Sequence, residues 1–315
     1  NASPLILEGS VKHLTQLNYV NVVAKAGSIR RAAEQLNITS TALNRRVLAL
    51  EDELGTPIFE RLPQGVRLNV AGELLIQHIR QSMADLSKVV SQIADLSGVR
   101  RGHVRIAGGS EIIGSFLPQR IADYRSHHSG VSFEILRRAP EKALRALQDY
   151  DADISLIFAP VPPTEYQVLA TVALDICVAM GPSHPLASKS SISLVDCQEY
   201  PAIMPAEGSG LFDLLFNAQT HKGIKLQQAI TSESFEFMSH YSQFENAITF
   251  LLPLSQSDSG MNNSGLVTRP FDPRDRISGL LHLVQTKGRV LPVASAKFAE
   301  DLVQYLNKSF PNATN

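Results

Sequence analysis

Two groups of side chains in the first seventy residues have the chemistry needed to contact DNA. The guanidinium groups can neutralise phosphates; they belong to Arg30, Arg31, Arg45, Arg46, Arg61 and Arg67. The short polar side chains can hydrogen-bond to base edges; they belong to Ser40, Thr41 and Asn44. Arginine and asparagine make bidentate hydrogen bonds to bases in the major groove. The pattern therefore predicts that Thr41, Asn44 and Arg45 read bases while the other arginines hold phosphates.

Three polar loops farther along the chain could hold a small molecule. They lie at 108–111, 206–210 and 231–235. The candidate contact residues in them are Gly109, Ser110, Glu111, Glu207, Ser209, Ser232, Ser234 and Phe235, although by sequence alone each stretch is just a polar loop. Amides and a hydroxyl at the N-terminus of a helix bind anions, although Ser110 could instead simply cap the helix that follows. Glu111 would repel a bound carboxylate, so the alternative of a polar or cationic ligand remains.

The motifs of common enzyme classes are not found. Gly108, Gly109 and Gly114 lack the spacing of a dinucleotide-binding fingerprint. Gly208-Ser209-Gly210 lacks the residue that flanks the serine on each side in a nucleophile elbow. We therefore expect a protein that is not an enzyme and that uses no cofactor.

The histidines and cysteines also give no metal or redox signature. His127 and His128 lie beside each other with no further ligands nearby, and His184 stands in a proline-flanked loop. Cys177 and Cys197 are too few for a disulfide framework and have no neighbouring metal ligands. We expect no metal site and two reduced thiols.

Helices have to position the basic residues of the first seventy. Leu43, Val47, Leu50 and Leu54 recur on one helical face, in a helix that Thr39 or Ser40 can cap and Gly55 can end. A shorter helical run at 29–36 joins it through 37–38, which predicts a helix-turn-helix, and another helix at 14–24 precedes both. Two short apolar runs around 63–65 predict a hairpin wing.

One long helix follows, over residues 71–96. Its apolar residues alternate spacings of four and three, the pattern of a coiled-coil seam: Ile79, Met83, Leu86, Val90 and Ile93. The strip is narrow, which suits one partner helix and predicts dimerisation, although the helix could instead lie on its own domain. Two copies would present two recognition helices to two half-sites.

Strands and helices alternate after residue 102, in the order of a parallel sheet covered by helices. We expect one α/β lobe from residues 103–170 with 269–315 and a second from 171–268. A ligand would bind between the lobes, at the carboxyl ends of the strands.

The first part of the chain resembles the winged helix-turn-helix of LysR-type transcriptional regulators. The matching residues are dense over about sixty residues. They are 32–36, 42–43, Arg45, 50–51, 54–55, 59–62, 65–68 and 71–72. It departs at base-facing positions, where the family often has Gln-Pro in place of Ser40-Thr41 and Ser in place of Asn44. We therefore expect an unusual operator sequence.

The resemblance implies more than the residues alone. It implies an α/β protein with an all-α-plus-wing DNA-binding domain over 11–70, a dimerisation linker over 71–98, and a two-lobed periplasmic-binding-protein-like effector domain in which the three polar loops line the cleft. The loop 181–187 resembles the start of the family's second lobe, whereas the family's Gly-x-Gly is missing near 244–247. The resemblance also implies homodimers or homotetramers on bent promoter DNA, and it leaves RNA polymerase open as a further partner.

Composition limits the remaining options. The formal net charge is -1 and the isoelectric point about 6.8, so any nucleic-acid site must be a local basic patch. No apolar run reaches the roughly eighteen residues of a membrane span and no signal peptide is visible, so we expect a cytoplasmic protein without a membrane partner. The prediction is a sequence-specific transcriptional regulator controlled by a small-molecule effector. The alternative is a solute-binding or enzymatic α/β domain fused to a DNA-binding module.

Overall fold

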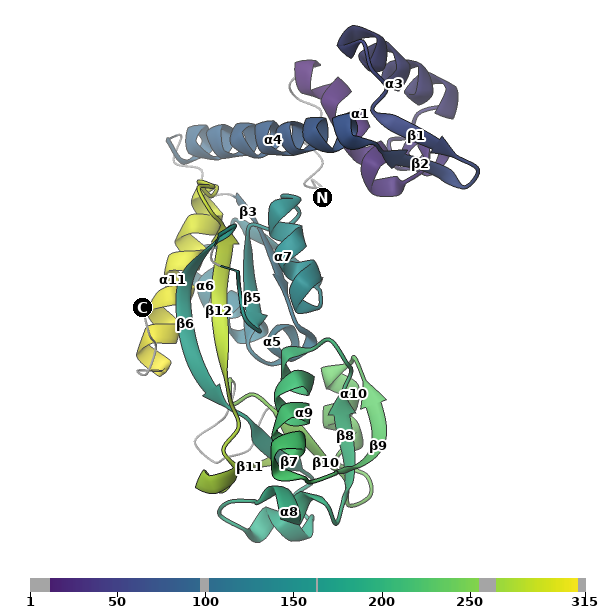
Figure 1. The fold of residues 1–315 in the computed structure, drawn as a ribbon. Coiled ribbons are helices and arrows are strands. Elements are labelled where there is room, and N and C mark those ends of the chain that lie inside the picture. Colours follow the sequence, from purple (N-terminus) through teal and green to yellow (C-terminus); the bar gives the residue numbers. More distant parts are fainter. Residues whose placement is uncertain (1–11, 97–101, 163, 255–264, 311–315) are drawn as a thin grey trace. The chain divides into compact units, whose positions relative to one another are not determined.

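The computed structural model describes residues 12–96, 102–162, 164–254 and 265–310 (Figure 1). The chain divides into two compact units, residues 1–99 and 100–315. Residue 11 of the predicted DNA-binding domain and residues 97–98 of the predicted linker lie outside the described residues.

The N-terminal unit consists of helices followed by a hairpin and a long helix. Its elements are α1 (Lys12–Ala26), α2 (Ile29–Gln35), α3 (Ser40–Leu54), β1 (Phe59–Leu62), β2 (Gly65–Leu68) and α4 (Val70–Leu96). The predicted caps of α3 are confirmed: the Thr39 hydroxyl accepts a hydrogen bond from the Ala42 amide at 3.2 Å, and Gly55 ends the helix in the left-handed region. Leu43, Val47 and Ile58 are buried in its core.

The wing is fixed to the turn between α1 and α2 by a glycine. The Val66 amide donates to the Gly27 carbonyl at 3.0 Å. Gly65 has φ +147°, and a Cβ there would lie 2.2 Å from the same carbonyl oxygen. Only glycine allows this approach, so the hairpin is held in a set position beside the helices.

The first turns of α4 belong to the core of the N-terminal unit. Ile76 and Ile79 are fully buried in the same cluster as Leu43 and Val47, and Met83 packs against its edge. The assignment of Ile79 to a dimer seam is therefore corrected, because its side chain is already covered by its own domain. The alternative of a helix lying on its own domain holds for this half of α4.

The first lobe of the second unit is a five-stranded sheet in the order β4-β3-β5-β12-β6. The strands are β3 (Gly102–Gly108), β4 (Val131–Arg137), β5 (Ile154–Phe158), β6 (Tyr166–Asp175) and β12 (Ser278–Thr286). The helices are α5 (Ser110–Ser115), α6 (Leu117–His127), α7 (Pro140–Gln148) and α11 (Val293–Ser309). β3, β4 and β5 run parallel, so their carboxyl ends share one edge. The helical segment after β3 is divided into α5 and α6, and Pro118 near the start of α6 supplies no amide hydrogen.

The second lobe is a sheet in the order β11-β7-β10-β8-β9. Its strands are β7 (Cys177–Met180), β8 (Pro201–Pro205), β9 (Gln227–Ser232), β10 (Ile248–Leu251) and β11 (Val267–Pro270). Its helical segments are η2 (Pro185–Ser188), α8 (Leu194–Cys197), α9 (Gly210–Lys222), α10 (Phe235–Tyr241) and, near the return to the first lobe, η3 (Pro273–Asp275).

Both predicted crossovers are displaced. β6 pairs with β12 in the first sheet as far as Asp175, so the chain enters the second lobe at Ile176 and not near Ala170. β11 pairs with β7 through Pro270, so the return comes after that residue and not before it. Where the chain passes from one lobe to the other, the strands of both sheets are apolar and look alike in sequence. Only the strands with which they pair show to which sheet each belongs.

Candidate functional site

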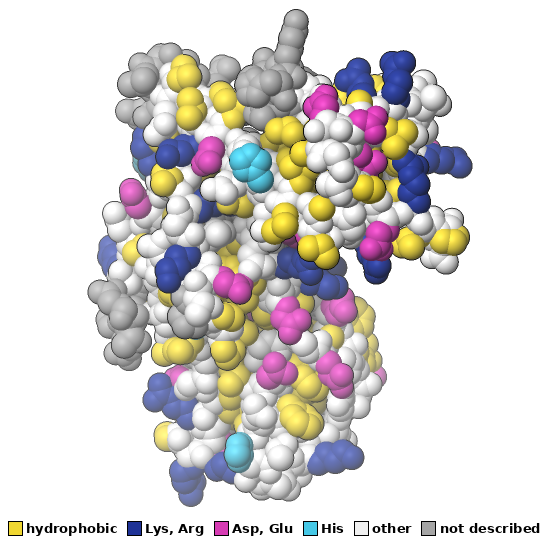
Figure 2. Space-filling model, turned by 45° about the horizontal axis from the view of Figure 1, so that its top comes forward, with side chains coloured by type: hydrophobic (Ala, Val, Ile, Leu, Met, Phe, Trp, Pro, Cys, Tyr) yellow, Lys and Arg dark blue, Asp and Glu magenta, His cyan; other side chains and the backbone are white. Residues whose placement is uncertain are grey.

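The exposed side of α3 carries the residues predicted to read DNA. Leu43, Val47 and Leu50 are buried on the opposite side of the helix, which turns Thr41 and Arg45 toward solvent. Figure 2 shows Lys and Arg side chains gathered on the surface of the N-terminal unit, with acidic side chains between them. The packing thus gives α3 one covered face and one free polar face.

The wing is joined to this face by a side-chain hydrogen bond. Arg61 Nη2 donates to Asn44 Oδ1 at 3.0 Å. The bond occupies the amide oxygen of Asn44 and leaves its amino group available as a donor. Arg61 and Asn44 therefore form one polar group that spans β1 and α3.

Several of the other arginines have partners within the unit. Arg67 Nη2 lies 2.7 Å from Glu60 Oε2, Arg30 Nε lies 3.2 Å from Glu34 Oε1, and the Arg46 guanidinium lies 4.7 Å from the centre of the Tyr19 ring. The two ion pairs are exposed, and exposed pairs contribute little stability, so a phosphate could replace either carboxylate. Arg31 and Arg45 form no ion pair with any residue that the structure describes.

A cavity of about 410 Å³ lies between the two lobes. Six predicted effector residues line it: Gly109, Ser110, Glu111, Glu207, Ser209 and Ser232. Ser234 and Phe235 are not among the lining residues, which corrects their assignment. The Ser234 hydroxyl instead caps α10 by accepting from the Phe237 amide at 3.1 Å, and Phe235 is buried.

Ser110 connects the two lobes. Its Oγ accepts a hydrogen bond from the Phe235 amide at 3.0 Å. Nearby, a Cβ at Gly114 would lie 3.3 Å from the Phe235 ring, so α5 and α10 approach closely. Gly109, and not Ser110, is the N-cap of α5, and the Ser110 hydroxyl keeps its O–H as a donor while its oxygen accepts from Phe235.

Glu111 places its carboxyl group over the Gly109 backbone. A Cβ at Gly109 would lie 2.8 Å from Oε1 and 2.9 Å from Oε2. Burial raises the pKa of Glu111 above its ordinary value of 4.5, with a smaller opposing effect from its own backbone amide. The cavity therefore contains one carboxyl group that is costly to ionise.

The sequence-based prediction missed the basic wall of the cavity. Arg137, Arg138 and Lys142 line it from the turn between β4 and α7. Arg137 and Arg138 stand at the carboxyl end of β4, which runs parallel to β3 and shares an edge of the sheet with it. Ligands bind at the carboxyl ends of parallel strands, and this rule applies to the turn after β4 as it does to 108–111.

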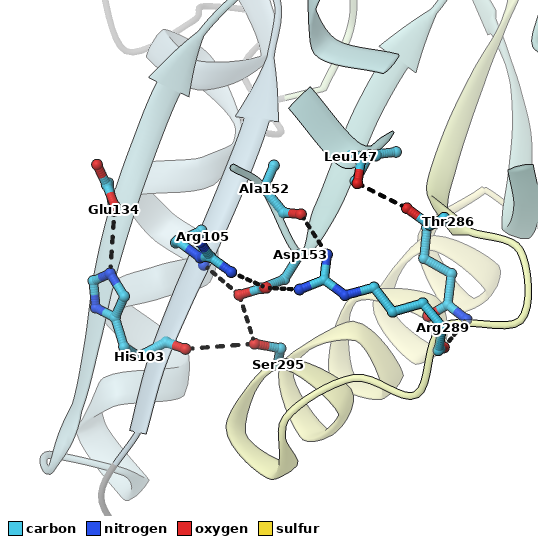
Figure 3. A network of polar contacts seen from close by, with 10 residues as sticks. His103, Arg105, Glu134, Leu147, Ala152, Asp153, Thr286, Arg289 and Ser295 are labelled. Carbon is cyan, nitrogen blue, oxygen red and sulfur yellow. Dashed lines mark hydrogen bonds and ion pairs between the residues drawn. The ribbon is translucent and has the colours of Figure 1, made fainter. Parts of the chain in front are cut away.

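A second polar cluster occupies the opposite end of the first-lobe sheet (Figure 3). Asp153, only 1% exposed, accepts from Arg105 Nη2 at 2.9 Å, from Arg289 Nη2 at 2.7 Å and from Ser295 Oγ at 3.0 Å. Burial raises the pKa of Asp153, but the two guanidinium groups and their hydrogen bonds outweigh it and hold the pKa below its ordinary value. Sequence reasoning did not identify this cluster, which fastens α11 to β3 and β5.

The cysteines and histidines are in structural positions. Cys177 and Cys197 are buried, and burial raises the pKa of Cys197 to about 12, which keeps it a thiol at neutral pH. His128 stacks on Tyr124 at 4.1 Å. His184 is buried, its Nδ1 accepts from the Leu186 amide at 3.1 Å, and burial lowers its pKa.

The described part of the chain has neither a metal-binding cluster nor a membrane-spanning helix. Its His, Cys, Asp and Glu side chains nowhere come together in a group of three that could hold a metal ion. None of its helices has the length and apolar character needed to cross a membrane.

Two separate parts of the chain match two known protein-family domains. Residues 14–73 match the bacterial regulatory helix-turn-helix of the lysR family, and residues 97–307 match the LysR substrate binding domain. The chain belongs to the LysR family of transcriptional regulators. The predicted family is thereby confirmed.

Two LysR-type relatives illustrate the similarity in sequence. The RuBisCO operon transcriptional regulator of Allochromatium vinosum is 34% identical over 199 residues, covering 62% of this chain and 65% of the relative. The probable HTH-type transcriptional regulator LrrA of Synechococcus elongatus is 32% identical, covering 55% of this chain and 59% of the relative. The matches thus span less than two thirds of the length of either relative.

Solved structures of LysR-type proteins share the fold along nearly the whole chain. A full-length variant of OxyR from Pseudomonas aeruginosa has a TM-score of 0.68 at 20% identity, covering 92% of this chain and 94% of its own. Full-length CbnR complexed with its target DNA has a TM-score of 0.61 at 17% identity, covering 93% and 99%. The predicted fold, a winged helix-turn-helix and long helix followed by a two-lobed α/β domain, is confirmed.

Proposed function

We propose that this protein is a ligand-responsive transcriptional regulator that binds a specific double-stranded promoter site through α3 and the wing. The observation that carries the proposal is the polar face of α3, which is exposed along the side opposite its buried leucines. A helix mounted in this way fits the major groove. The solved complex of CbnR with its target DNA supports the assignment of DNA as the partner.

The side chains divide into two roles on such a site. Thr41, Asn44 and Arg45 are assigned to base edges, with Ser40 beside them at the start of the helix. Phosphate contacts are assigned to Arg30, Arg31, Arg61 and Arg67 at the periphery. Arg46 packs on Tyr19, so its contribution to DNA binding is secondary.

The second half of α4 is assigned to self-association. Leu86 and Val90 are partly exposed there, and Val89 between them is 46% exposed. Apolar side chains at this spacing suit a second copy of the same helix. A dimer, or a tetramer built from two dimers, would bring two copies of α3 to two half-sites.

The effector domain is assigned a binding role and no reaction. The described residues of the cleft include no cysteine or histidine to act as nucleophile or base. Ser209, which is present, caps α9 by accepting from the Phe212 amide at 3.1 Å. Since its target is genomic DNA, the protein is proposed to act in the cytoplasm.

Selection of genomic fragments on the purified full-length protein, at low and at raised salt, tests this function. Non-specific phosphate binding falls steeply with salt, so a specific regulator retains a small set of fragments at the higher concentration. Arg45→Ala should weaken discrimination between those fragments and competitor DNA by about 1–3 kcal/mol. Lys287→Ala, which removes an exposed charge from the effector domain, serves as the control and should change nothing.

Two results would count against the proposal. Fragments that all wash off together at raised salt, with and without candidate effectors, would show that binding is non-specific. Unchanged discrimination in Arg45→Ala would remove this side chain from the base-reading set.

The oligomer has its own test. Leu86→Glu combined with Val90→Glu should shift the protein toward monomer in sedimentation velocity, because it places charges in the proposed helix pair. Ile79→Glu is unsuitable, since Ile79 lies in the domain core. The matched control is Gln81→Glu, which adds a charge at an exposed position of the same helix. A double variant that sediments like the unmodified protein would overturn the assignment.

A further inference from the structure

The two walls of the cleft carry opposite charges. The first lobe contributes Arg137, Arg138 and Lys142, together with the partly buried Glu111. The second lobe contributes Glu207 and Glu233, and no lysine or arginine. The difference follows from the turns that form the walls: the turn after β4 is basic, and the turns after β8 and β9 are acidic.

These charges are not used by the described protein itself. No ion pair joins Arg137, Lys142, Glu207 or Glu233 to any residue in the described parts of the chain. All four are exposed side chains, although they line a cavity. In the same unit, basic residues elsewhere pair with aspartates at 2.6–2.9 Å: Lys189, Arg276 and Lys222. Charges left unpaired around a cavity are available to a ligand.

The rest of the cavity limits the size and character of that ligand. Leu156, Phe158, Leu211 and Met238 line the cavity between the charged turns, although each is almost fully buried. A volume of about 410 Å³ is at the small end of the range for small-molecule sites. A short apolar body with a charged group at each end matches these features.

We propose that the effector is an amphoteric small molecule whose anionic group faces Arg137 and Lys142 and whose cationic group faces Glu207 and Glu233. The inference rests on the proposed function, because it names the ligand class for the cleft of that regulator. A dianion would leave the acidic wall facing a negative charge, and a dication would leave the basic wall facing a positive one. Opposite charges at the two ends also draw the lobes together, so the ligand favours a closed arrangement.

The experiment measures thermal unfolding of the full-length protein with probes matched in length. The four-carbon set is 4-aminobutyrate, succinate and 1,4-diaminobutane; the six-carbon set is 6-aminohexanoate, adipate and 1,6-diaminohexane. Each is added at the same high concentration and ionic strength. The amphoteric member of at least one set should raise Tm by about 2–5 °C more than the dianion and the dication do.

Charge reversal on each wall sharpens the test without disturbing the core. Glu207→Lys with Glu233→Lys should transfer the preference to the dianion. Arg137→Glu with Lys142→Glu should transfer it to the dication. All four positions are exposed, so these variants should fold, and Asp301→Lys on the outer face of α11 is the control.

Three results would overturn the proposal. They are a larger shift with a dianion or a dication on the unmodified protein, no shift with any amphoteric probe, and charge-reversed variants that keep the original preference. Fragment selection on the same protein separates this failure from failure of the proposed function. Specific fragments without an amphoteric response would refute the ligand class alone, whereas an amphoteric response without specific fragments would refute the regulator.

Discussion

Charged side chains are buried and bonded at one end of β5 and exposed at the other. Asp153, directly before the strand, is buried and bonded to Arg105, Arg289 and Ser295. Beyond Phe158, at the other end, charged side chains of the cleft such as Arg137 and Glu207 are exposed and unpaired among the described residues. The same residue types therefore serve structure at one edge of the sheet and remain available for a ligand at the other.

The difference shows that bonding state, more than residue type, identifies a functional charge. A buried ion pair is costly to break because the remaining charge loses its solvent and its partner together. An exposed unpaired charge contributes little to folding. The contrast between the two edges predicts a graded set of effects on stability.

The largest effect is expected at Asp153. Asp153→Asn would leave Arg289, whose side chain is only 5% exposed, without its compensating charge. We expect the free energy of unfolding of the effector domain to fall by about 3–5 kcal/mol, measured by urea denaturation. The exposed Asp301→Asn on α11 should change it by less than about 0.5 kcal/mol. An unaltered midpoint in Asp153→Asn would show that the cluster does not stabilise the fold.

The pH dependence of the Asp153 contribution has a fixed sign. The folded-state pKa of Asp153 is held below its ordinary value of 3.8. Its contribution is therefore complete above that value and is lost as the pH falls through the lower, folded-state pKa. The stability gap between the unmodified protein and Asp153→Asn should close only in strong acid.

An intermediate effect of opposite sign is expected at Glu111. Its pKa is raised by burial, so the carboxyl is favoured when protonated and costs stability as the pH rises through the folded-state pKa. Glu111→Gln should therefore stabilise the protein at neutral pH, by about 1 kcal/mol. The gain should vanish at low pH, where both side chains are neutral. Thermal unfolding across pH measures this, and a loss of stability at neutral pH would contradict it.

The smallest effect is expected from the unpaired basic residues. Arg137→Gln combined with Lys142→Gln breaks no ion pair among the described residues. We expect the free energy of unfolding to change by less than about 0.5 kcal/mol without ligand, measured by the same urea titration. A loss as large as that of Asp153→Asn would mean that these charges are structural and would remove the contrast between the two edges.

The N-terminal fold was predictable because its signals are local. Thr39, Gly55 and the leucines of α3 lie within one helix, and caps and periodicity operate at that range. Ile79 was misassigned because apolar residues spaced alternately by four and three positions show that a helix has an apolar face. They do not show whether its own domain or a second copy covers that face. The turn after α10 contains a left-handed residue, Glu245, with φ +56°, in the region where the family's Gly-x-Gly is missing from this chain.

The candidate site was only partly predictable, for a related reason. Loops at the carboxyl ends of strands can be located from element order, which found 108–111 and 206–210 but overlooked the turn after β4. The partners of Asp153 are 48, 136 and 142 residues away along the chain. No periodicity connects residues at such separations, and only the folded sheet brings them together.

The most direct test of the central claim measures how cleft occupancy changes DNA binding. The Kd of the full-length protein for a selected fragment would be determined with and without a compound that raises its Tm, in parallel with Glu207→Lys combined with Glu233→Lys. The account predicts that the compound changes the Kd or the footprint of the unmodified protein, and that the variant no longer responds, because binding at two sites is reciprocally coupled. A compound that occupies the cleft and leaves both the Kd and the footprint unchanged would contradict it.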